Sequence, residues 1–494
     1  MRIPLVLLAS SLVLAACNAG TDVQYLDFAD PEAEDSKADD PIAPPLPTCT
    51  TELARAVLSS KDASGRSVLS TLRNGTLPAQ YFATQRNLAA KDALLRGPEI
   101  FPSMAELIAR AEYNVDFQTY VWENDTDPAN SILDGLRRLG ERIHRERPQG
   151  PAVRVRILID VTGLGFASKL STIPRTFAKL AALQLDPNAV EVQLGYYYHL
   201  AFGNLHVKTV VADGRAAIIT GANPQAHHNY ADPWNDAGFR VDGEIAIALT
   251  ADFNDAWRRG HRWTCGARED QELSQCSEKP TVESVAVVSM PELASACLPI
   301  FVVGRKASGN PLSNSVDNPQ DQAFLGAFRS AQHTIRMLTP NLNDDAAKAG
   351  LVAAAVRGVR VEIVLSKEFN DGSENLPGQG GTNEKNAAAL YEALAAQLPD
   401  PALRCARLEI RWYSLDGVTP IEGNGLYASH SKYLSIDSAA AIVGTANMDT
   451  QSWNNSREVN LLVDDEATTR SWDEQVFAPA WNGGVSTLAA DCGR

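Results

Sequence analysis

Long apolar runs are missing from most of this sequence. After residue 17 no segment approaches about 18 consecutive apolar residues, the length that a membrane-spanning helix needs. We therefore expect no transmembrane helix. The chain also lacks CxxC pairs and cysteine–histidine clusters with zinc spacing, so a structural metal is not expected.

Positive charge is also scarce. The chain has 44 Lys and Arg against 60 Asp and Glu, a formal net charge of -16. Proteins that follow a nucleic acid backbone usually carry a basic face. This balance argues against nucleic acid as a partner, although a small basic cleft is compatible with an acidic total.

The N-terminus has the layout of an export signal. Met1 and Arg2 precede an apolar run from Ile3 to Val13, and small residues then lead to Cys17. This arrangement resembles the bacterial lipoprotein box, which implies that Cys17 is lipidated and becomes the mature N-terminus. We expect a protein anchored by lipid in a bacterial cell envelope, in the periplasm or on the outer surface. An ordinary cleaved signal with an incidental cysteine is the alternative.

Six cysteines follow Cys17, and an even number in an exported chain predicts disulfides. Six cysteines allow 15 connectivities, and the sequence does not choose between them. Cys265 with Cys276 is the most local pair.

Four regions are predicted along the chain. Residues 1–17 form the signal, and the acidic, proline-rich segment 18–48 is expected to be a solvated tether. A repeated order of helices and strands divides the rest, with a first unit at 49–290 and a second at 291–494. The join is expected between Trp263 and about Pro299.

The repeat consists of alternating helices and strands. In the first unit we expect helices at 104–111 and 131–145, and strands at 115–122, 153–160 and 190–197. In the second unit the helices are expected at 322–331 and 346–357, and the strands at 334–339, 359–365 and 408–413. This order predicts an α/β fold with largely parallel, helix-covered sheets.

Each unit ends in a His-x-Lys motif followed by an aspartate and an asparagine. The shared positions are His206, Lys208, Asp213 and Asn223 in the first unit, and His430, Lys432, Asp437 and Asn447 in the second. We expect each His-x-Lys pair to lie on one face of a strand, since side chains alternate along a strand. Lysine neutralises phosphate oxygens, and histidine attacks phosphorus or protonates a leaving oxygen, so a phosphodiester is the expected substrate.

The second segment resembles the phospholipase D superfamily motif without a gap, with Gly444 and Thr445 at its turn. Its continuation, 448–452 and 457–460, looks like bacterial cardiolipin synthases. The first segment departs from the motif at Thr220-Gly221, and Trp234, Asp236, Gly243-Glu244, Phe253 and Trp257 also look like the family's first half. The resemblance covers roughly residues 98 to 480.

This resemblance implies two tandem α/β/α sandwich units, related by a pseudo-two-fold axis, with one active site at their interface. It also implies a two-step reaction that needs no metal or other cofactor. His206 would attack phosphorus, and His430 would protonate the departing alcohol and then activate water or an acceptor alcohol. Lys208, Lys432, Asn223 and Asn447 would hold the phosphate oxygens.

Four carboxylates are given supporting roles. Asp236 and Glu458 are expected to orient one histidine each by hydrogen bonding a ring nitrogen, with Glu244 or Asp242 as alternatives to Asp236. Asp213 and Asp437 are expected to stabilise the fold through a charge pair, away from the chemistry.

Three further groups of residues lie near the motifs, and the sequence leaves their contacts open. His199, His227 and His228 are interpreted as loop histidines that contact solvent or substrate. The aromatic run 196–202 is either strand and core or a contact to acyl chains. The segment 370–386 is either a mobile loop over the second unit or an insertion without a role.

Phospholipid hydrolysis or headgroup exchange, by a monomer, is the predicted function. The alternatives are a phosphatidyltransferase similar to cardiolipin synthase, an exported endonuclease of the same superfamily, and a lipoprotein that keeps the fold as a binding module.

Overall fold

A computed structural model describes residues 23–25, 44–89, 92–162, 166–199, 202–266, 272–280, 287–289, 297–308, 310 and 313–488. The predicted signal, Cys17 and most of the tether lie outside these residues. In the described parts of the chain, no helix is both long and apolar enough to cross a membrane.

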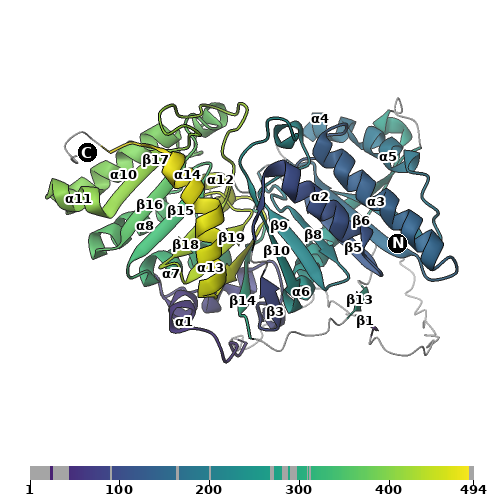
Figure 1. Ribbon diagram of the computed structural model, residues 1–494, viewed down its shortest axis with the longest axis horizontal. Coiled ribbons are helices and arrows are strands. Elements are labelled where there is room, and N and C mark those ends of the chain that lie inside the picture. The colour runs from purple at the N-terminus through teal and green to yellow at the C-terminus, as the bar shows by residue number, and fades with distance from the viewer. Residues whose placement is uncertain are drawn as a thin grey trace, which may run out of the picture.

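Two halves of the same design lie side by side along the longest axis, the first in blue to teal and the second in green to yellow (Figure 1). The first half contains strands β5 (Asn114–Thr119), β6 (Val153–Asp160), β7 (Val190–Tyr197), β8 (Thr209–Ala212), β9 (Ala216–Thr220) and β10 (Ala237–Gly243). The second contains β15 (Thr334–Thr339), β16 (Arg360–Leu365), β17 (Leu408–Trp412), β18 (Tyr433–Ile436), β19 (Ala440–Gly444) and β20 (Glu458–Val463).

The strand order shows the duplication directly. The first sheet contains the order β7-β6-β5-β8-β9-β10, and the second contains β17-β16-β15-β18-β19-β20. The α/β fold and its two units are therefore confirmed. The expectation of a largely parallel sheet is wrong, because only the first three strands of each half run parallel. The other three pair antiparallel. Tight turns at 213–215 and 437–439 join β8 to β9 and β18 to β19.

Both sheets are extended at their edges by short strands. The first sheet gains β11 (Gly260–Thr264), β12 (Ser277–Pro280), β3 (Asn87–Ala89) and β4 (Leu94–Leu95). The second gains β14 (Ile300–Arg305), β2 (Ala83–Thr84) and β21 (Val485–Ser486). A separate pair joins β1 (Val23–Tyr25) to β13 (Val287–Ser289).

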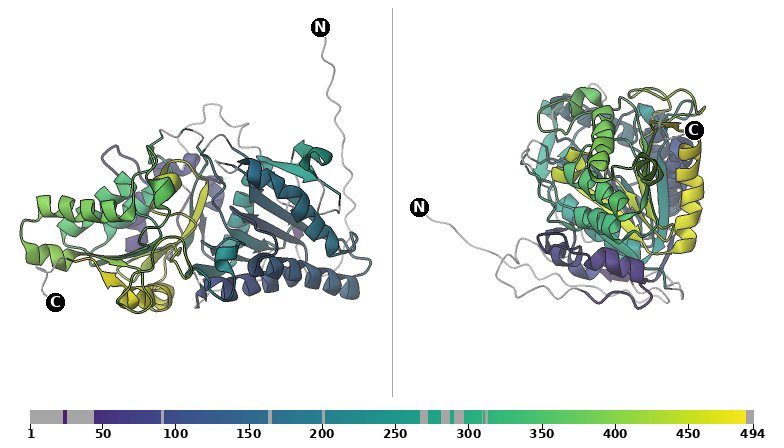
Figure 2. Two further views of the ribbon diagram at one scale, coloured as in Figure 1. Left: turned by 90° about the horizontal axis from the view of Figure 1, so that it is seen from above. Right: turned by 90° about the vertical axis from the view of Figure 1, so that its left-hand side faces the viewer.

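Helices cover the outer face of each sheet (Figures 1 and 2). In the first half these are α2 (Arg96–Ala109), α3 (Asp127–Glu146), α4 (Phe166–Ser171) and α5 (Ile173–Ala182). In the second half they are α7 (Pro319–Ser330), α8 (Asp345–Arg357), α10 (Asn383–Gln397) and α11 (Pro401–Arg407). The sequence sets the start of α3, since the Thr126 side chain accepts a hydrogen bond from the backbone N–H of Ala129. Its buried residues recur at helical spacing, which turns one apolar face to the sheet.

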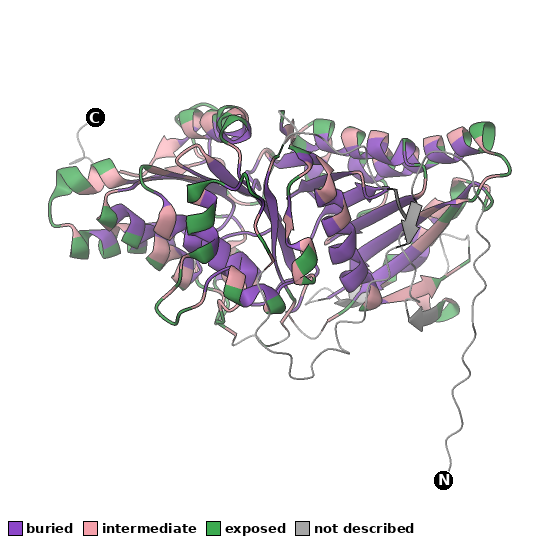
Figure 3. Ribbon diagram, turned by 90° about the horizontal axis from the view of Figure 1, so that it is seen from below, coloured by how far each residue is buried: buried purple, intermediate pink, exposed green. Residues whose placement is uncertain are grey.

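The inner faces of the two sheets share one apolar core. Phe239 and Val241 of β10 lie in the same cluster as Val459 and Leu461 of β20. Helices α6 (Glu244–Arg258), α13 (Glu466–Trp472) and α14 (Ala478–Gly483) close this core, through residues such as Trp257 and Trp472. Buried residues accordingly dominate the strands (Figure 3). This shared core fixes one half against the other, as a composite site requires.

The N-terminal segment packs against the second half in space. Helix α1 (Glu52–Ser59) contacts α7, and β2 pairs with β14 of the second sheet. A disulfide between Cys49 and Cys297 joins this segment to the chain just before β14. Helix α1 and strand β2 therefore pack with the second half, although the division of the sequence at 49 and 291 assigns them to the first unit.

Cys265 and Cys276, the most local of the possible pairs, form a second disulfide. Cys405 is also disulfide-bonded.

Candidate active site

Two short backbone bridges join the halves where the motifs lie. Leu205 pairs with Arg457, and Ser429 pairs with Asn235, each in a parallel bridge. The backbone N–H of His206 donates to the carbonyl of Arg457 at 3.0 Å, and that of His430 donates to the carbonyl of Asn235 at 2.8 Å. Each bridge therefore brings a motif histidine close to the next residue of the other half, the one that follows Arg457 or Asn235 in the sequence.

Those following residues are Glu458 and Asp236. His206 Nδ1 lies 2.8 Å from Glu458 Oε1, and His430 Nδ1 lies 2.8 Å from Asp236 Oδ2. Each half thus supplies the carboxylate that orients the histidine of the other half. With Nδ1 held by a carboxylate, Nε2 of each ring is the nitrogen left for chemistry. Glu244 is not the carboxylate in question, since it pairs with Arg86.

The His-x-Lys pairs do not lie on strands as expected. Strand β8 begins at Thr209 and β18 at Tyr433, one residue after each lysine. Just before these strands, the backbone pairs with the other half instead of with the neighbouring strand of its own sheet, so the regular strand pairing ends there. Lys208 Nζ donates to the carbonyl of His206 at 2.8 Å, and Lys432 makes the equivalent bond to His430. Each of these hydrogen bonds holds a lysine ammonium close to the histidine of the same motif.

Burial and positive charge set the protonation of the site. Burial, with the nearby Lys208 and Lys432, lowers the pKa of His206 well below its ordinary value. Burial and Lys432 do the same for His430. Burial also lowers the pKa of Lys208 well below its ordinary value and that of Lys432 to about 8. Without substrate, the two imidazoles are therefore neutral.

The pKa values of the two carboxyl groups that contact the histidines, Glu458 and Asp236, are shifted in opposite directions. Burial raises the pKa of Glu458 to about 8, despite hydrogen bonds from Thr445 and Ser452. Burial alone would also raise the pKa of Asp236, but Lys432 and hydrogen bonds from His228 and His430 hold it below its ordinary value. His430 therefore faces an ionised carboxylate throughout the neutral range.

Asp213 and Asp437 stabilise the fold, but through a different contact from the expected charge pair. Asp213 accepts hydrogen bonds from the backbone N–H groups of residues 112, 113 and 114, at 2.7–2.9 Å. Asp437 accepts the equivalent three from residues 332, 333 and 334, at 2.8–2.9 Å. Each carboxylate ties the turn after the motif strand to the start of β5 or β15. Both lie away from the histidines.

The two motif asparagines are in different settings. Asn223 Oδ1 accepts from the backbone N–H of Val121 at 3.2 Å, and the side chain is buried. Asn447 Nδ2 donates to Asp449 Oδ2 at 2.7 Å, and Asn447 lines an open cavity.

The departure at Thr220-Gly221 has a steric cause. A Cβ on Gly221 would lie 2.5 Å from Asp236 Oδ1 and 2.6 Å from Lys432 Cδ. Thr445 occupies the corresponding place in the second motif, where its hydroxyl donates to Glu458 at 2.6 Å. Glycine is therefore needed where the shorter Asp236 approaches the backbone.

His228 was misinterpreted from the sequence. It is fully buried and its Nε2 lies 3.3 Å from Asp236 Oδ2, so it contacts the same carboxylate as His430. His228, Asp236 and His430 lie close enough to hold a metal ion, with ligand atoms within 4.8 Å of one another. In the described structure the shared carboxylate hydrogen bonds both rings. His228 follows the first motif in a segment without a periodic pattern of apolar residues, so nothing in the sequence indicated that it is buried.

A cavity of about 300 Å³ opens beside His206. Tyr120, Lys169, Glu374 and Asp449 line it, and sequence reasoning named none of them as site residues. Residues 370, 373, 374, 376 and 379 also line it, so the segment 370–386 lies over the site and contains a short helix, α9 (Asp371–Glu374).

The aromatic run is mainly core. Tyr196 and Tyr197 are each 1% exposed and belong to β7, which contradicts a contact with acyl chains at those positions. Tyr198 is 42% exposed, and Phe202 lines the cavity beside His206.

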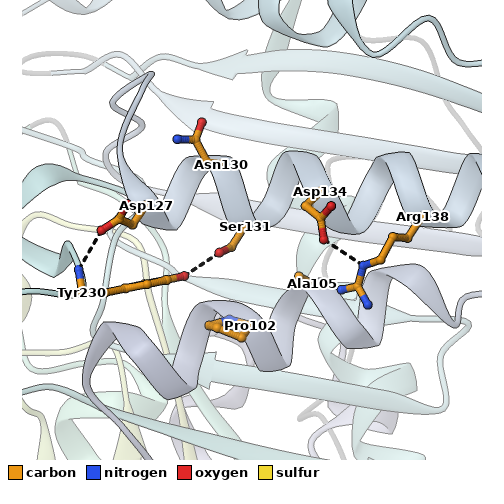
Figure 4. A pocket seen from close by; sticks show the side chains of 8 residues that line it. All are labelled: Pro102, Ala105, Asp127, Asn130, Ser131, Asp134, Arg138 and Tyr230. Atoms are coloured by element: carbon orange, nitrogen blue, oxygen red, sulfur yellow. Dashed lines mark hydrogen bonds and ion pairs between the residues drawn. The ribbon is translucent and has the colours of Figure 1, made fainter.

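A second cavity, of about 330 Å³, lies between α2 and α3 on the outer face of the first half (Figure 4). Its polar groups are bonded to one another: Tyr230 to Ser131, and Arg138 to Asp134. Arg138 also pairs with Glu106 of α2, at 2.8 Å. This pair holds α2 and α3 together, so we assign this cavity to the structure of the first half.

Comparisons with known proteins agree with this architecture. The family model "Cardiolipin synthase, PLD-like domain" matches residues 324–481. The chain is 24% identical over 384 residues to the probable cardiolipin synthase YwiE of Bacillus subtilis, covering 76% of this chain and 63% of that protein. It is 21% identical over 455 residues to phospholipase D of Streptomyces antibioticus, covering 80% and 78%. The chain thus spans less than two thirds of the length of YwiE.

The structure resembles that of phosphatidylserine synthase from Haemophilus influenzae Rd KW20, with a TM-score of 0.53 and 16% identity over 81% of this chain and 87% of that one. At this identity the likeness concerns the fold. The sequence matches make this chain similar to proteins of the phospholipase D superfamily.

Proposed function

We propose that this protein cleaves or exchanges the headgroup of glycerophospholipids through a phosphohistidine intermediate. The strongest support is that the carboxylate of each half orients the histidine of the other half. Two oriented, neutral imidazoles therefore lie beside two lysines in one site. The lipid-acting relatives supply the substrate class.

The first step forms the phosphohistidine. Nε2 of His206 attacks phosphorus, and the P–O bond to the leaving alcohol breaks. His430 gives that alcohol its proton, so it must be an imidazolium when the bond breaks. A bound phosphodiester adds negative charge near the ring, which raises the pKa of His430 and favours uptake of that proton. The ionised Asp236 stabilises the imidazolium.

The second step discharges the intermediate. Neutral His430 takes a proton from water or an acceptor alcohol, whose oxygen attacks phosphorus and releases His206. Lys208, Lys432, Asn223 and Asn447 hold the non-bridging oxygens. The resemblance favours His206 as the nucleophile, and the pseudo-symmetric geometry is compatible with either histidine.

Phosphatidyl transfer to a second lipid is the closest alternative, because the matched family model is that of a cardiolipin synthase domain. We also propose that Cys17 carries a lipid anchor that keeps the protein at a membrane of the cell envelope, where such substrates lie.

The test combines two histidine variants with an acceptor assay. His206→Ala and His430→Ala should each abolish turnover of phosphatidylglycerol or phosphatidylethanolamine, whereas His144→Ala, at an exposed position on α3, should have no effect. A primary alcohol should divert product from phosphatidic acid to the phosphatidyl-alcohol. Substantial activity in either motif variant would refute the composite site. Degradation of DNA without turnover of lipid would refute the substrate class, and strict dependence on a divalent metal would refute the histidine mechanism.

A further inference from the structure

The cavity beside His206 has an acidic wall. Glu374 of α9 and Asp449, just before α12 (Thr450–Asn454), both line it, and they are 7% and 4% exposed. Glu374 accepts a hydrogen bond from Asn343 Nδ2. Burial, reinforced by the Asp449 carboxylate, raises the pKa of Glu374 to about 8. The two carboxyl groups therefore repel one another across a space that is open to a small ligand.

An unpaired acceptor lies at the same place. Asn447 is 6% exposed and lines the cavity, and its Oδ1 atom is buried without a hydrogen-bond partner. Its Nδ2 donates to Asp449 Oδ2 at 2.7 Å, which orients the amide. A buried carbonyl oxygen without a donor costs free energy that a ligand donor would recover.

Positive charge on the lining is already neutralised. Among the described residues that line the cavity, Lys169 is the lysine, and no arginine joins it. Lys169 Nζ lies 2.7 Å from Asp160 Oδ2 and 4.3 Å from the centre of the Tyr120 ring. With Lys169 paired to Asp160, no lysine or arginine among the described lining residues pairs with Glu374 or Asp449.

We propose that this cavity binds the protonated primary amine of a phospholipid headgroup or of an acceptor alcohol, with ethanolamine as the simplest case. An ammonium has three N–H donors, and the cavity offers Glu374, Asp449 and Asn447 Oδ1 as three acceptors. A calcium ion would need six to eight oxygen ligands, and both Asp449 oxygens already accept hydrogen bonds, from Asn447 and from the backbone of Ser452. This inference rests on the proposed function and specifies its substrate.

The experiment compares two lipids that differ in headgroup charge. The full-length protein is assayed at pH 8 on mixed micelles of phosphatidylethanolamine or phosphatidylglycerol with identical acyl chains. The wild type should prefer phosphatidylethanolamine in kcat/KM. Glu374→Gln should lower that value for phosphatidylethanolamine by about 10-fold or more, since a charge-assisted hydrogen bond is lost, and leave phosphatidylglycerol nearly unchanged.

The matched control is Glu392→Gln, the same substitution at an exposed position on α10. It should leave the ratio of the two lipids as in the wild type. An equal loss on both lipids in Glu374→Gln, or a wild type that prefers phosphatidylglycerol, would overturn the proposal. Turnover of phosphatidylglycerol that rises with millimolar calcium and depends on Glu374 would make the cavity a metal site instead.

A binding assay separates this inference from the proposed function. Soluble glycerophosphoethanolamine and glycerophosphoglycerol are titrated into His430→Ala protein by calorimetry, with and without Glu374→Gln. Tighter binding of the ethanolamine compound, lost on Glu374→Gln, supports the amine site even if neither lipid is hydrolysed. Equal binding of the two compounds, or no binding of either, refutes it. Absence of turnover on both lipids refutes the proposed function alone.

Discussion

Arg457 is expected to be one of the most costly residues to replace. It lies at the bridge before Glu458, is 1% exposed, and contacts Asp252 and Asp255 of α6 in the other half, each at 2.5 Å. Both carboxylates are buried too. Arg457→Met keeps an unbranched side chain of similar reach but removes the cation closest to both carboxylates. Asp255 keeps the more distant Arg259, at 3.5 Å.

The size of the effect follows from this burial. Removal of one partner from a buried ion pair typically costs about 3–5 kcal/mol, because the remaining charge stays desolvated. With a urea m value of about 3 kcal/mol/M or more, the unfolding midpoint should fall by roughly 1 M. Circular dichroism during urea titration measures this shift.

Two further variants test the cause. In Arg457→Met, the additional changes Asp252→Asn and Asp255→Asn should restore much of the lost stability, because they remove the unpaired charges. Arg137→Met on α3 is the control, since Arg137 pairs with Asp134 and Glu141 on the surface and should leave the midpoint nearly unchanged. A midpoint for Arg457→Met equal to that of the control would refute the argument, and so would a triple variant less stable than Arg457→Met.

Three other predictions concern pH and export. Burial lowers the pKa of Lys432 to about 8, so kcat/KM should fall as pH rises through about 8. In Lys432→Arg this fall should occur at higher pH. A wild-type pH–rate profile without a fall near pH 8 would contradict this prediction. Burial raises the pKa of Asp321 to about 7, so its favourable contribution to folding is complete below about pH 4 and is lost as pH rises through 7. Urea midpoints between pH 5 and pH 8.5 should therefore decline less in Asp321→Asn than in the wild type, and parallel declines would count against this. Cys17→Ser should release the protein from membranes or block its maturation, and mass spectrometry of the mature N-terminus would show an unmodified terminus elsewhere if the anchor is absent.

The repeated architecture could be predicted from the sequence because its signal is local. Apolar periodicity located α3 and β6 to within a few residues, and two equally spaced His-x-Lys motifs indicated the duplication. The contacts of Glu458 with His206 and of Asp236 with His430 agree with the expected orienting roles. Their catalytic roles stay predictions.

The remaining features depend on contacts between distant parts of the chain. His-x-Lys segments have the composition of strands, yet tertiary bridges to the other half use their backbone and end the strands. His228 and Glu374 carry no periodic pattern, and their positions follow from how loops pack over the motifs. The aromatic run allowed either a core strand or a contact to acyl chains. Tyr197 is core, because β7 is covered on both faces.

The two motifs have diverged in a coordinated way. The first half contributes the shorter Asp236, and its reach to His430 requires that Gly221 have no side chain. The second half contributes the longer Glu458, and there Thr445 has room to donate its hydroxyl. Each histidine depends on the carboxylate of the opposite half, so a change at either turn acts on the chemistry of the other motif. The site therefore consists of two unequal halves that share one backbone plan, and this inequality is the structural basis on which the two histidines can take different roles.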